Sequence, residues 1–195
     1  MTAAESLLNV SNVHVVYPAR RRGGKSARAV DGVDLDIRSG EIIALVGESG
    51  CGKTTLARAI LGLQETSEGS IAFGGELLPT SASGKKAFRR RAQIVFQDPT
   101  ASLNPRHSVY EIVAEGLRIH GLVENEHQVV KNALEQCGLH PAERYMLKYP
   151  HELSGGQRQR VVIAGAMVLK PQLLVADEPV SSLDASVRGE ILALL

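Results

Sequence analysis

Net charge, cysteine and long apolar runs are all scarce in this chain, and each scarcity excludes a class of protein. The net charge is only +1, which gives no overall bias toward nucleic acid or a membrane surface. The two cysteines do not indicate a disulfide framework or a metal site, and we expect reduced thiols and a cytoplasmic address. Because there is no signal peptide and no apolar run of about 18 residues, we expect no segment to span a bilayer.

The 195 residues suffice for one domain with a real core, and no internal repeat is evident. Basic runs occur at residues 20–22, 85–86 and 89–91. We expect these runs to form solvated loops and helix faces, with phosphate or lipid-headgroup contact as the weaker alternative.

The most informative segment, Gly47–Thr54, fits the phosphate-binding pattern Gly-x-x-x-x-Gly-Lys-Ser/Thr. Apolar residues 42–46 predict a buried strand before it, and residues 55–61 predict a helix after it. Such a turn would aim backbone N–H groups and the positive end of the helix dipole at one concavity. We expect Lys53 to lie along the β- and γ-phosphates of a nucleotide, and the Thr54 hydroxyl to take one Mg²⁺ position. The alternative is a chance Gly-rich turn.

A second candidate anion site begins at Leu153-Ser-Gly-Gly-Gln157, ahead of the apolar residues 161–169. Ser154 is a natural N-cap for the helix that these residues predict. Gly155 and Gly156 would let an anion approach the first-turn amides. Taken alone, an ordinary capped helix explains this segment better than a binding site does.

Two acids, Asp177 and Glu178, follow the apolar strand expected at residues 173–176. Ligands of α/β proteins bind at the carboxyl edge of the sheet, where such a strand presents its last side chains. Asp177 suits a Mg²⁺ site opposite Thr54, and Glu178 suits the water that attacks a γ-phosphate. The alternative is a solvated acidic turn before Pro179.

Hydrophobic patterning predicts the remaining organisation. Residues 6–17, 33–37 and 70–77 favour short strands joined by Gly-rich turns. Between residues 99 and 148 the pattern is helical. One apolar face comprises Val109, Ile112, Val113 and Leu117; the next comprises Val129, Val130, Ala133 and Leu134.

In combination, the phosphate loop, the Leu-Ser-Gly-Gly-Gln sequence and the Asp-Glu pair resemble the nucleotide-binding subunit of ABC transporters, from about residue 6 to the last residue. The resemblance implies an α/β P-loop NTPase of the ABC ATPase fold, with a RecA-like parallel core sheet, an antiparallel β region and a helical subdomain. It implies one nucleotide-binding domain over 1–195, with the helical subdomain at about 99–168. In the family, two subunits face head to tail, and each signature helix closes over the γ-phosphate held by the other.

The resemblance assigns a set of residues to ATP and Mg²⁺. Glu178, Lys53 and Gln97 are the expected catalytic residues, and Thr54, Gln97 and Asp177 are the expected Mg²⁺ ligands. The expected nucleotide-binding residues are Tyr17, Gly47, Glu48, Ser49, Gly50, Cys51, Gly52, Lys53, Thr54, Thr55, Gln97, Ser154, Gly155, Gly156, Gln157, Asp177 and Asp184.

Three of these residues have roles that only the family suggests. Gln97, after the apolar strand expected at 92–96, joins the catalytic core to the helical subdomain. Tyr17 would stack on adenine, and a core or surface tyrosine is the alternative. Asp184 would touch the phosphate site of the opposite subunit, and it would also serve as the N-cap of a helix from Ala185.

The segments Gln97–Arg106 and Tyr149–Ser154 look like those of peptide/nickel importer ATPases. This implies an ATP-hydrolysing subunit that powers import of dipeptides, oligopeptides or a related solute such as nickel. The implied partners are a second, identical or related ABC ATPase subunit, two integral membrane permease subunits and, indirectly, a solute-binding protein; nucleic acid is not expected. The implied location is peripheral, on the cytoplasmic face of the cell membrane.

The sequence departs from the family pattern at its end, about 17 residues after Glu178. The family continues with another strand and a histidine that contacts the γ-phosphate. None of the histidines here follows Glu178; they are His14, His107, His120, His127, His140 and His151. We therefore expect a C-terminally truncated fragment rather than a natural remnant, with an apolar sheet edge left exposed.

Two other functions stay open. The second possibility is a module that binds a nucleotide and does not hydrolyse it, and the absence of the family's histidine motivates this alternative. A soluble ABC ATPase acting on ribosomes or DNA is the third possibility, although the single signature copy and the absence of a long coiled coil argue against it.

Overall fold

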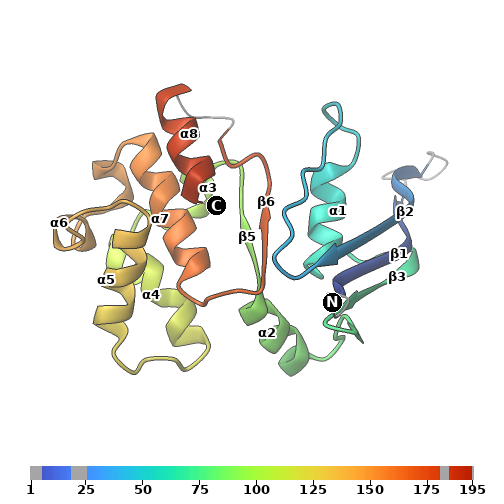
Figure 1. Cartoon of the computed structure of the whole chain (residues 1–195), viewed down its shortest axis with the longest axis horizontal. Coiled ribbons are helices and arrows are strands. Elements are labelled where there is room, and N and C mark those ends of the chain that lie inside the picture. The colour runs from blue at the N-terminus through green and yellow to red at the C-terminus, as the bar shows by residue number, and fades with distance from the viewer. Residues whose placement is uncertain (1–5, 19–25, 181–184, 195) are drawn as a thin grey trace. The chain divides into compact units, whose positions relative to one another are not determined.

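The computed structural model describes residues 6–18, 26–180 and 185–194. The chain divides into two compact units, Met1–Phe88 and Arg89–Leu195, and the division falls within helix α2, Ala82–Arg91 (Figure 1). Among the described residues, most of the regular secondary structure of the first unit is β-strand, whereas the second unit is mostly helical.

The first unit is built on an antiparallel sheet with strand order β2-β1-β3-β4. Its strands are β1 Ser6–Tyr17, β2 Ala27–Arg38, β3 Glu68–Phe73 and β4 Glu76–Leu77. The strand predicted over 6–17 is confirmed, and its residues Leu8, Val10, Val13 and Val15 are buried. The expected strand 70–77 is two strands, because Gly74 and Gly75 both have positive φ and turn the chain between them.

Helix α1, Lys53–Ile60, packs on this sheet. Leu56, Ala57, Ala59 and Ile60 are buried, in the spacing that places one helix face against a neighbouring element. The predicted helix is confirmed and begins two residues earlier than expected.

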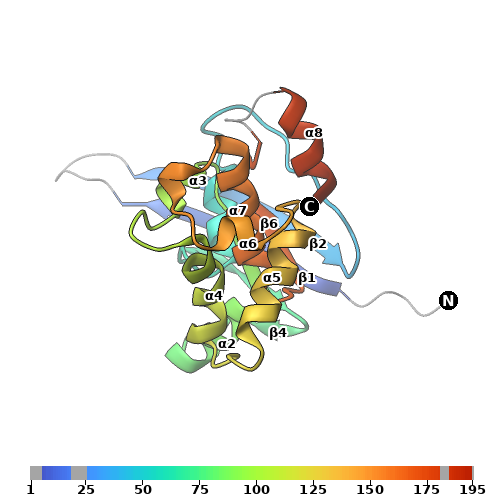
Figure 2. The same cartoon turned by 90° about the vertical axis from the view of Figure 1, so that its left-hand side faces the viewer.

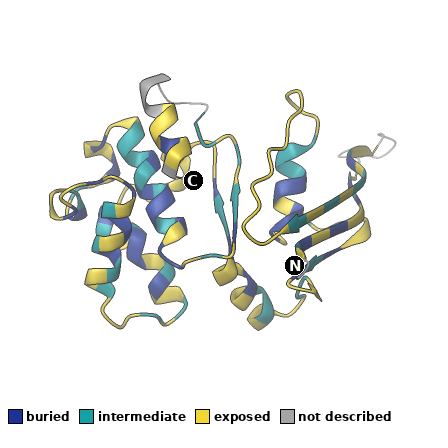
Figure 3. Ribbon diagram, in the orientation of Figure 1, coloured by how far each residue is buried: buried dark blue, intermediate teal, exposed yellow. Residues whose placement is uncertain are grey.

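The prediction of a buried strand at residues 42–46 is wrong. The segment is irregular, and Ile42 and Val46 are 92% and 90% exposed; Figure 3 draws the chain before α1 as exposed. A buried strand needs hydrogen-bonding neighbours and an apolar layer above it. Neither sheet of the described residues includes this segment, so its apolar composition alone does not bury it.

The second unit contains a pair of parallel strands, β5 Ala92–Val95 and β6 Leu173–Ala176, in the register Ala92↔Leu173 to Val95↔Ala176. Both strands lie where the apolar runs predicted them. Its helices are α3 Pro99–Ser102, α4 Val109–Ile119, α5 Glu126–Gln136, α6 Glu143–Met146, η1 Pro150–Glu152, α7 Gly155–Met167 and α8 Ala185–Leu194.

Helices α4, α5 and α7 lie side by side and enclose the core of this unit (Figure 1, Figure 2). Val113, Leu134 and Ile163 are fully buried there. The apolar faces predicted for α4 and α5 are confirmed, with Ile112 and Val129 partly buried at their margins. None of the helices in the described part of the chain combines the length and apolar character needed to cross a bilayer.

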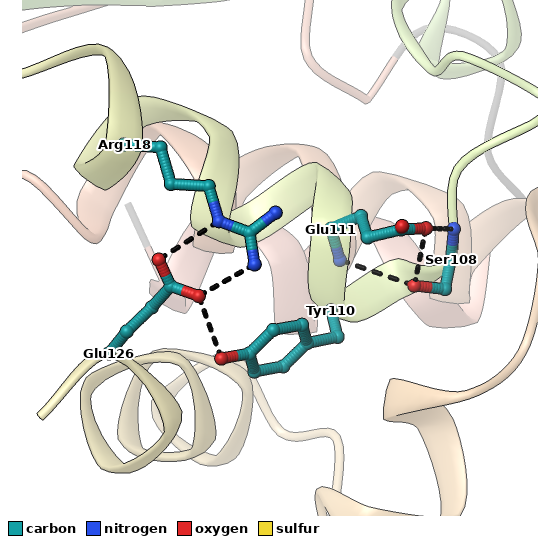
Figure 4. A network of polar contacts seen from close by, with 5 residues as sticks. All are labelled: Ser108, Tyr110, Glu111, Arg118 and Glu126. Atoms are coloured by element: carbon teal, nitrogen blue, oxygen red, sulfur yellow. Dashed lines mark hydrogen bonds and ion pairs between the residues drawn. The ribbon is translucent and has the colours of Figure 1, made fainter. Parts of the chain in front are cut away.

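A polar network joins α4 to the start of α5 (Figure 4). Glu126 accepts hydrogen bonds from the Tyr110 hydroxyl at 2.8 Å and from Nε and Nη2 of Arg118 at 3.0 and 2.7 Å. The Arg118 guanidinium lowers the pKa of the Glu126 carboxyl, while burial and the bond to Glu126 raise the pKa of Tyr110. Tyr110 and Arg118 line a hollow of about 660 Å³ on this unit, together with residues that include Leu147 and Tyr149.

Candidate active site

The phosphate loop ends on the first turn of α1. Gly50 and Gly52 have φ of +82° and +99°, values that favour glycine, and Gly52 is the N-cap of α1. The amide of Cys51 donates to Glu48 O at 3.3 Å, which closes the turn. Since the first amides of a helix have no intrahelical acceptor, this start presents N–H donors and the positive dipole end to an anion.

Gly52 is held against the neighbouring sheet. A Cβ at this position would lie 2.2 Å from the carbonyl oxygen of Ala29 in β2. At Gly47 a Cβ would lie 2.6 Å from Cys51 Sγ. Only glycine fits at Gly52 without a shift of the backbone, and the loop conformation therefore depends on its contact with β2.

The Lys53 ammonium lies on the loop itself. Its Nζ donates to Gly47 O at 2.8 Å and to Glu48 O at 2.9 Å. The positive charge is thus held over the same turn whose helix end favours an anion. This arrangement fits the β- and γ-phosphates of a nucleotide.

In the second unit, the ends of the two parallel strands bring three predicted site residues together. The Asp177 amide donates to Val95 O at 2.9 Å, which places the acidic pair beside the end of β5. Gln97 Nε2 donates to Glu178 Oε2 at 3.0 Å. Glu178 has a φ of +47°, an uncommon conformation for a residue other than glycine.

Each unit, taken by itself, holds side-chain oxygens of the kind that bind a divalent cation. Because the Gln97 amide nitrogen donates to Glu178, its amide oxygen is the atom that would ligate a metal. The Gln97 amide oxygen and the Asp177 carboxylate in the second unit, and separately the Thr54 hydroxyl in the first unit, are oxygen atoms of the kind that Mg²⁺ prefers. Thr54 belongs to the first unit, and Gln97 and Asp177 belong to the second.

Ser154 caps the signature helix as predicted. Its Oγ accepts from the Gln157 amide at 3.3 Å, and Gln157 Oε1 accepts from the Ser154 amide at 3.1 Å. This reciprocal capping box starts α7 at Gly155, which is exposed and has open space at its Cβ position. An anion therefore has steric access to the first turn.

The remaining predicted contacts stand as follows. Tyr17 ends β1 opposite Ala27 and is 37% exposed, so its ring is accessible. Asp184 lies outside the described residues. Cys51 is exposed in the loop, whereas Cys137 is buried at the end of α5, and burial raises the pKa of the Cys137 thiol to about 11.

Sequence reasoning missed two polar residues that support the site. Asp98 caps α3 by accepting from the amides of Thr100 and Ala101 at 2.8 and 3.3 Å. The Asp-Pro pair at positions 98 and 99 is a recognisable helix-start signal and could have revealed it. Arg158 bonds to Pro150, eight residues before it, and to Thr100, 58 residues before it, and no helix or capping pattern indicates such partners.

Comparison with known proteins places the chain in a family. The ABC transporter family matches residues 30–181, and the chain belongs to this family. The match includes the phosphate loop, the Leu-Ser-Gly-Gly-Gln segment and the Asp-Glu pair. The fold is that of an ABC ATPase, as solved relatives confirm.

Among those solved structures, cbiO1 from Clostridium perfringens, part of the ABC transporter complex cbiONQ, has a TM-score of 0.82 and 34% identity. The similarity covers 97% of this chain and 72% of that one. The dimeric ATP-binding cassette MJ0796 bound to ADP and Pi has a TM-score of 0.82 and 28% identity, over 96% of this chain and 80% of its own.

Curated relatives carry names from transport and import systems. The putative oligopeptide transport ATP-binding protein YkfD of Bacillus subtilis is 47% identical over 97% of this chain. The glutathione import ATP-binding protein GsiA of Escherichia coli O157:H7 is 45% identical over 98%. The chain spans 57% of the length of YkfD and 32% of GsiA.

Proposed function

We propose that this chain supplies the ATP-binding and ATP-hydrolysing part of a subunit that powers an importer of peptides or a related solute. The observation that carries the proposal is the 3.0 Å bond between Gln97 and Glu178 at the ends of two parallel strands. Phosphate binding needs only a loop and a lysine. Phosphoryl transfer to water also needs a group that positions the attacking water, and the Glu178 carboxylate, bonded to the Gln97 amide, suits that role.

Each residue has a defined task in this proposal. The α1 amides and Lys53 bind and orient the β- and γ-phosphates of ATP. Glu178 orients the attacking water and accepts its proton, and Gln97 holds the carboxylate in place. Thr54, Gln97 and Asp177 would hold Mg²⁺, which would supply charge neutralisation at the phosphates when bound.

The partners and location are further parts of the proposal. We infer a head-to-tail dimer in which residues 154–157 of one subunit approach the γ-phosphate held by the other; the dimeric structure of MJ0796 supports the formation of a dimer. The helical subdomain at about 99–168 would dock onto the membrane permease, which comprises two subunits, on the cytoplasmic face of the membrane. In the first unit, Tyr17 would stack on the adenine ring. The name of YkfD, an oligopeptide transport protein, and that of GsiA, a glutathione import protein, support peptides, including glutathione, as the transported class.

ATP turnover by the full-length protein tests the proposal. Glu178→Gln should abolish hydrolysis and retain ATP binding, whereas Lys53→Ala should lose binding. Glu115→Gln is a matched control, because Glu115 is exposed on α4. Wild-type turnover no faster than that of Glu178→Gln, with ATP still bound, would favour the non-hydrolysing module. Co-purification with two polytopic membrane proteins distinguishes a transporter from a soluble ABC ATPase.

A further inference from the structure

The signature helix carries an arginine that bridges two other elements. Arg158 lies near the start of α7, and its Nε donates to the carbonyl oxygen of Pro150 in η1 at 2.8 Å. Its Nη1 donates to Thr100 Oγ1 in α3 at 3.4 Å, across 58 residues of sequence. Because α3 also packs against α7, one guanidinium connects the segment before the signature with the segment after Gln97.

Helix α3 is fixed in turn to the end of β5. Asp98 holds the Thr100 amide at 2.8 Å and follows Gln97 directly, and Gln97 bonds to Glu178. A continuous series of contacts therefore runs from the Glu178 carboxylate, through Gln97 and the cap of α3, to Arg158 on α7.

The chemistry of the bridge suits arginine. A planar guanidinium carries its donors on separate nitrogens in fixed directions, so Nε and Nη1 each reach a different acceptor, whereas a lysine ammonium would have to reach both acceptors from one nitrogen. Both acceptors are neutral, and no carboxylate pairs with Arg158 within residues 6–18, 26–180 and 185–194. Bonds to neutral acceptors are weaker than ion pairs. The bridge can therefore hold an orientation and still rearrange.

We propose that Arg158 is a positioning residue that, through Thr100, sets the orientation of signature residues 154–157 relative to Gln97. The expected effect of Arg158 on ATP turnover rests on the proposed function. The expected effect of Arg158 on the orientation of residues 154–157 does not, because the bridge lies within one compact unit.

Hydrogen exchange of the full-length protein provides a readout that does not depend on hydrolysis. Thr100→Val removes one acceptor at nearly constant volume, and Arg158→Met removes both donors. The amides of Gln157 and Arg158 bond to Ser154 and report on the first turn of α7. We expect each variant to speed their exchange about three- to ten-fold, the range expected for loss of one or two hydrogen bonds.

Three comparisons sharpen the result. Arg106→Met, at an exposed arginine in the same unit, should leave this exchange unchanged. Arg158→Lys should give an intermediate rate, because its single nitrogen can take the place of only one of the two arginine nitrogens that make the bridge. The Thr100→Val, Arg158→Met double variant should exchange no faster than Arg158→Met alone, as expected for two groups that act through one contact.

The second readout is ATP turnover. In protein that hydrolyses ATP, Thr100→Val should lower kcat about three- to ten-fold and leave the Kd for ATP unchanged, since the phosphate loop belongs to the other unit. Unchanged exchange in Thr100→Val, or strictly additive effects in the double variant, would overturn the positioning role. Absence of turnover in the wild type would instead overturn the proposed function, and the exchange result would still decide the role of Arg158.

Discussion

The contact between the phosphate loop and β2 can be tested with a single methyl group. Gly52→Ala adds a Cβ where the carbonyl oxygen of Ala29 lies only 2.2 Å away, well short of the 3.0 Å that real Cβ contacts reach. The obstacle is backbone in a paired strand, so it cannot rotate aside. Either β2 or the loop must move.

Alanine substitutions at two other glycines serve as controls, because they carry the cost of a left-handed φ without the steric overlap. Gly50 and Gly40 also have left-handed φ, of +82° and +76°, but a Cβ at either would meet nothing within 4 Å. Alanine in this conformation costs about 1–2 kcal/mol, so the two control variants should lose that amount. Gly52→Ala adds an overpacking cost of about 1–3 kcal/mol, for a total of about 2–5 kcal/mol.

The assay is urea denaturation followed by circular dichroism, combined with calorimetric titration of Mg-ATP. Against a typical unfolding free energy of about 5–15 kcal/mol, the Gly52→Ala loss is large and measurable. We expect ATP affinity to fall at least about ten-fold in Gly52→Ala, because displaced amides no longer converge on the phosphates, and to stay at the wild-type value in Gly40→Ala. If Gly52→Ala is no less stable than Gly50→Ala, the loop does not pack on β2 as described.

Three further predictions concern the thiols, the polar network and the core. Cys51 should react rapidly with iodoacetamide at pH 8 and be protected by Mg-ATP, whereas Cys137, with a pKa raised to about 11, should remain unmodified under mass spectrometry until the protein unfolds. Because Arg118 lowers the pKa of Glu126 below the ordinary 4.5, the network should stabilise the fold above that pH and lose its effect as the pH falls through the lowered value. Thermal unfolding between pH 2 and 7 should therefore show wild type and Glu126→Gln converging in acid, and a constant difference would contradict this. Val113→Ala, in the fully buried face of α4, should cost about 1–3 kcal/mol in denaturant unfolding, while Val123→Ala, 57% exposed, should cost much less; equal losses would contradict the assigned core.

The sequence by itself predicted those features that depend only on residues close together in the chain. The periodicity of Val109, Val113 and Leu117 predicts the buried face of α4, because a helix repeats its own surface every 3.6 residues whatever its neighbours are. The cap at Ser154 is equally local, since both partners lie within three residues. The phosphate loop could also be predicted from the sequence, because all residues of its pattern lie in one continuous segment.

Only the tertiary structure decided which of these pieces meet. The apolar residues 42–46 lack a pairing strand among the described residues and lie exposed, although their composition predicts burial. The bonds from Gln97 to Glu178 and from Thr100 to Arg158 cross 81 and 58 residues, and no local pattern encodes them. Backbone preferences act over a few residues, whereas strand pairing and long-range side-chain contacts depend on which distant segments the folded chain brings together.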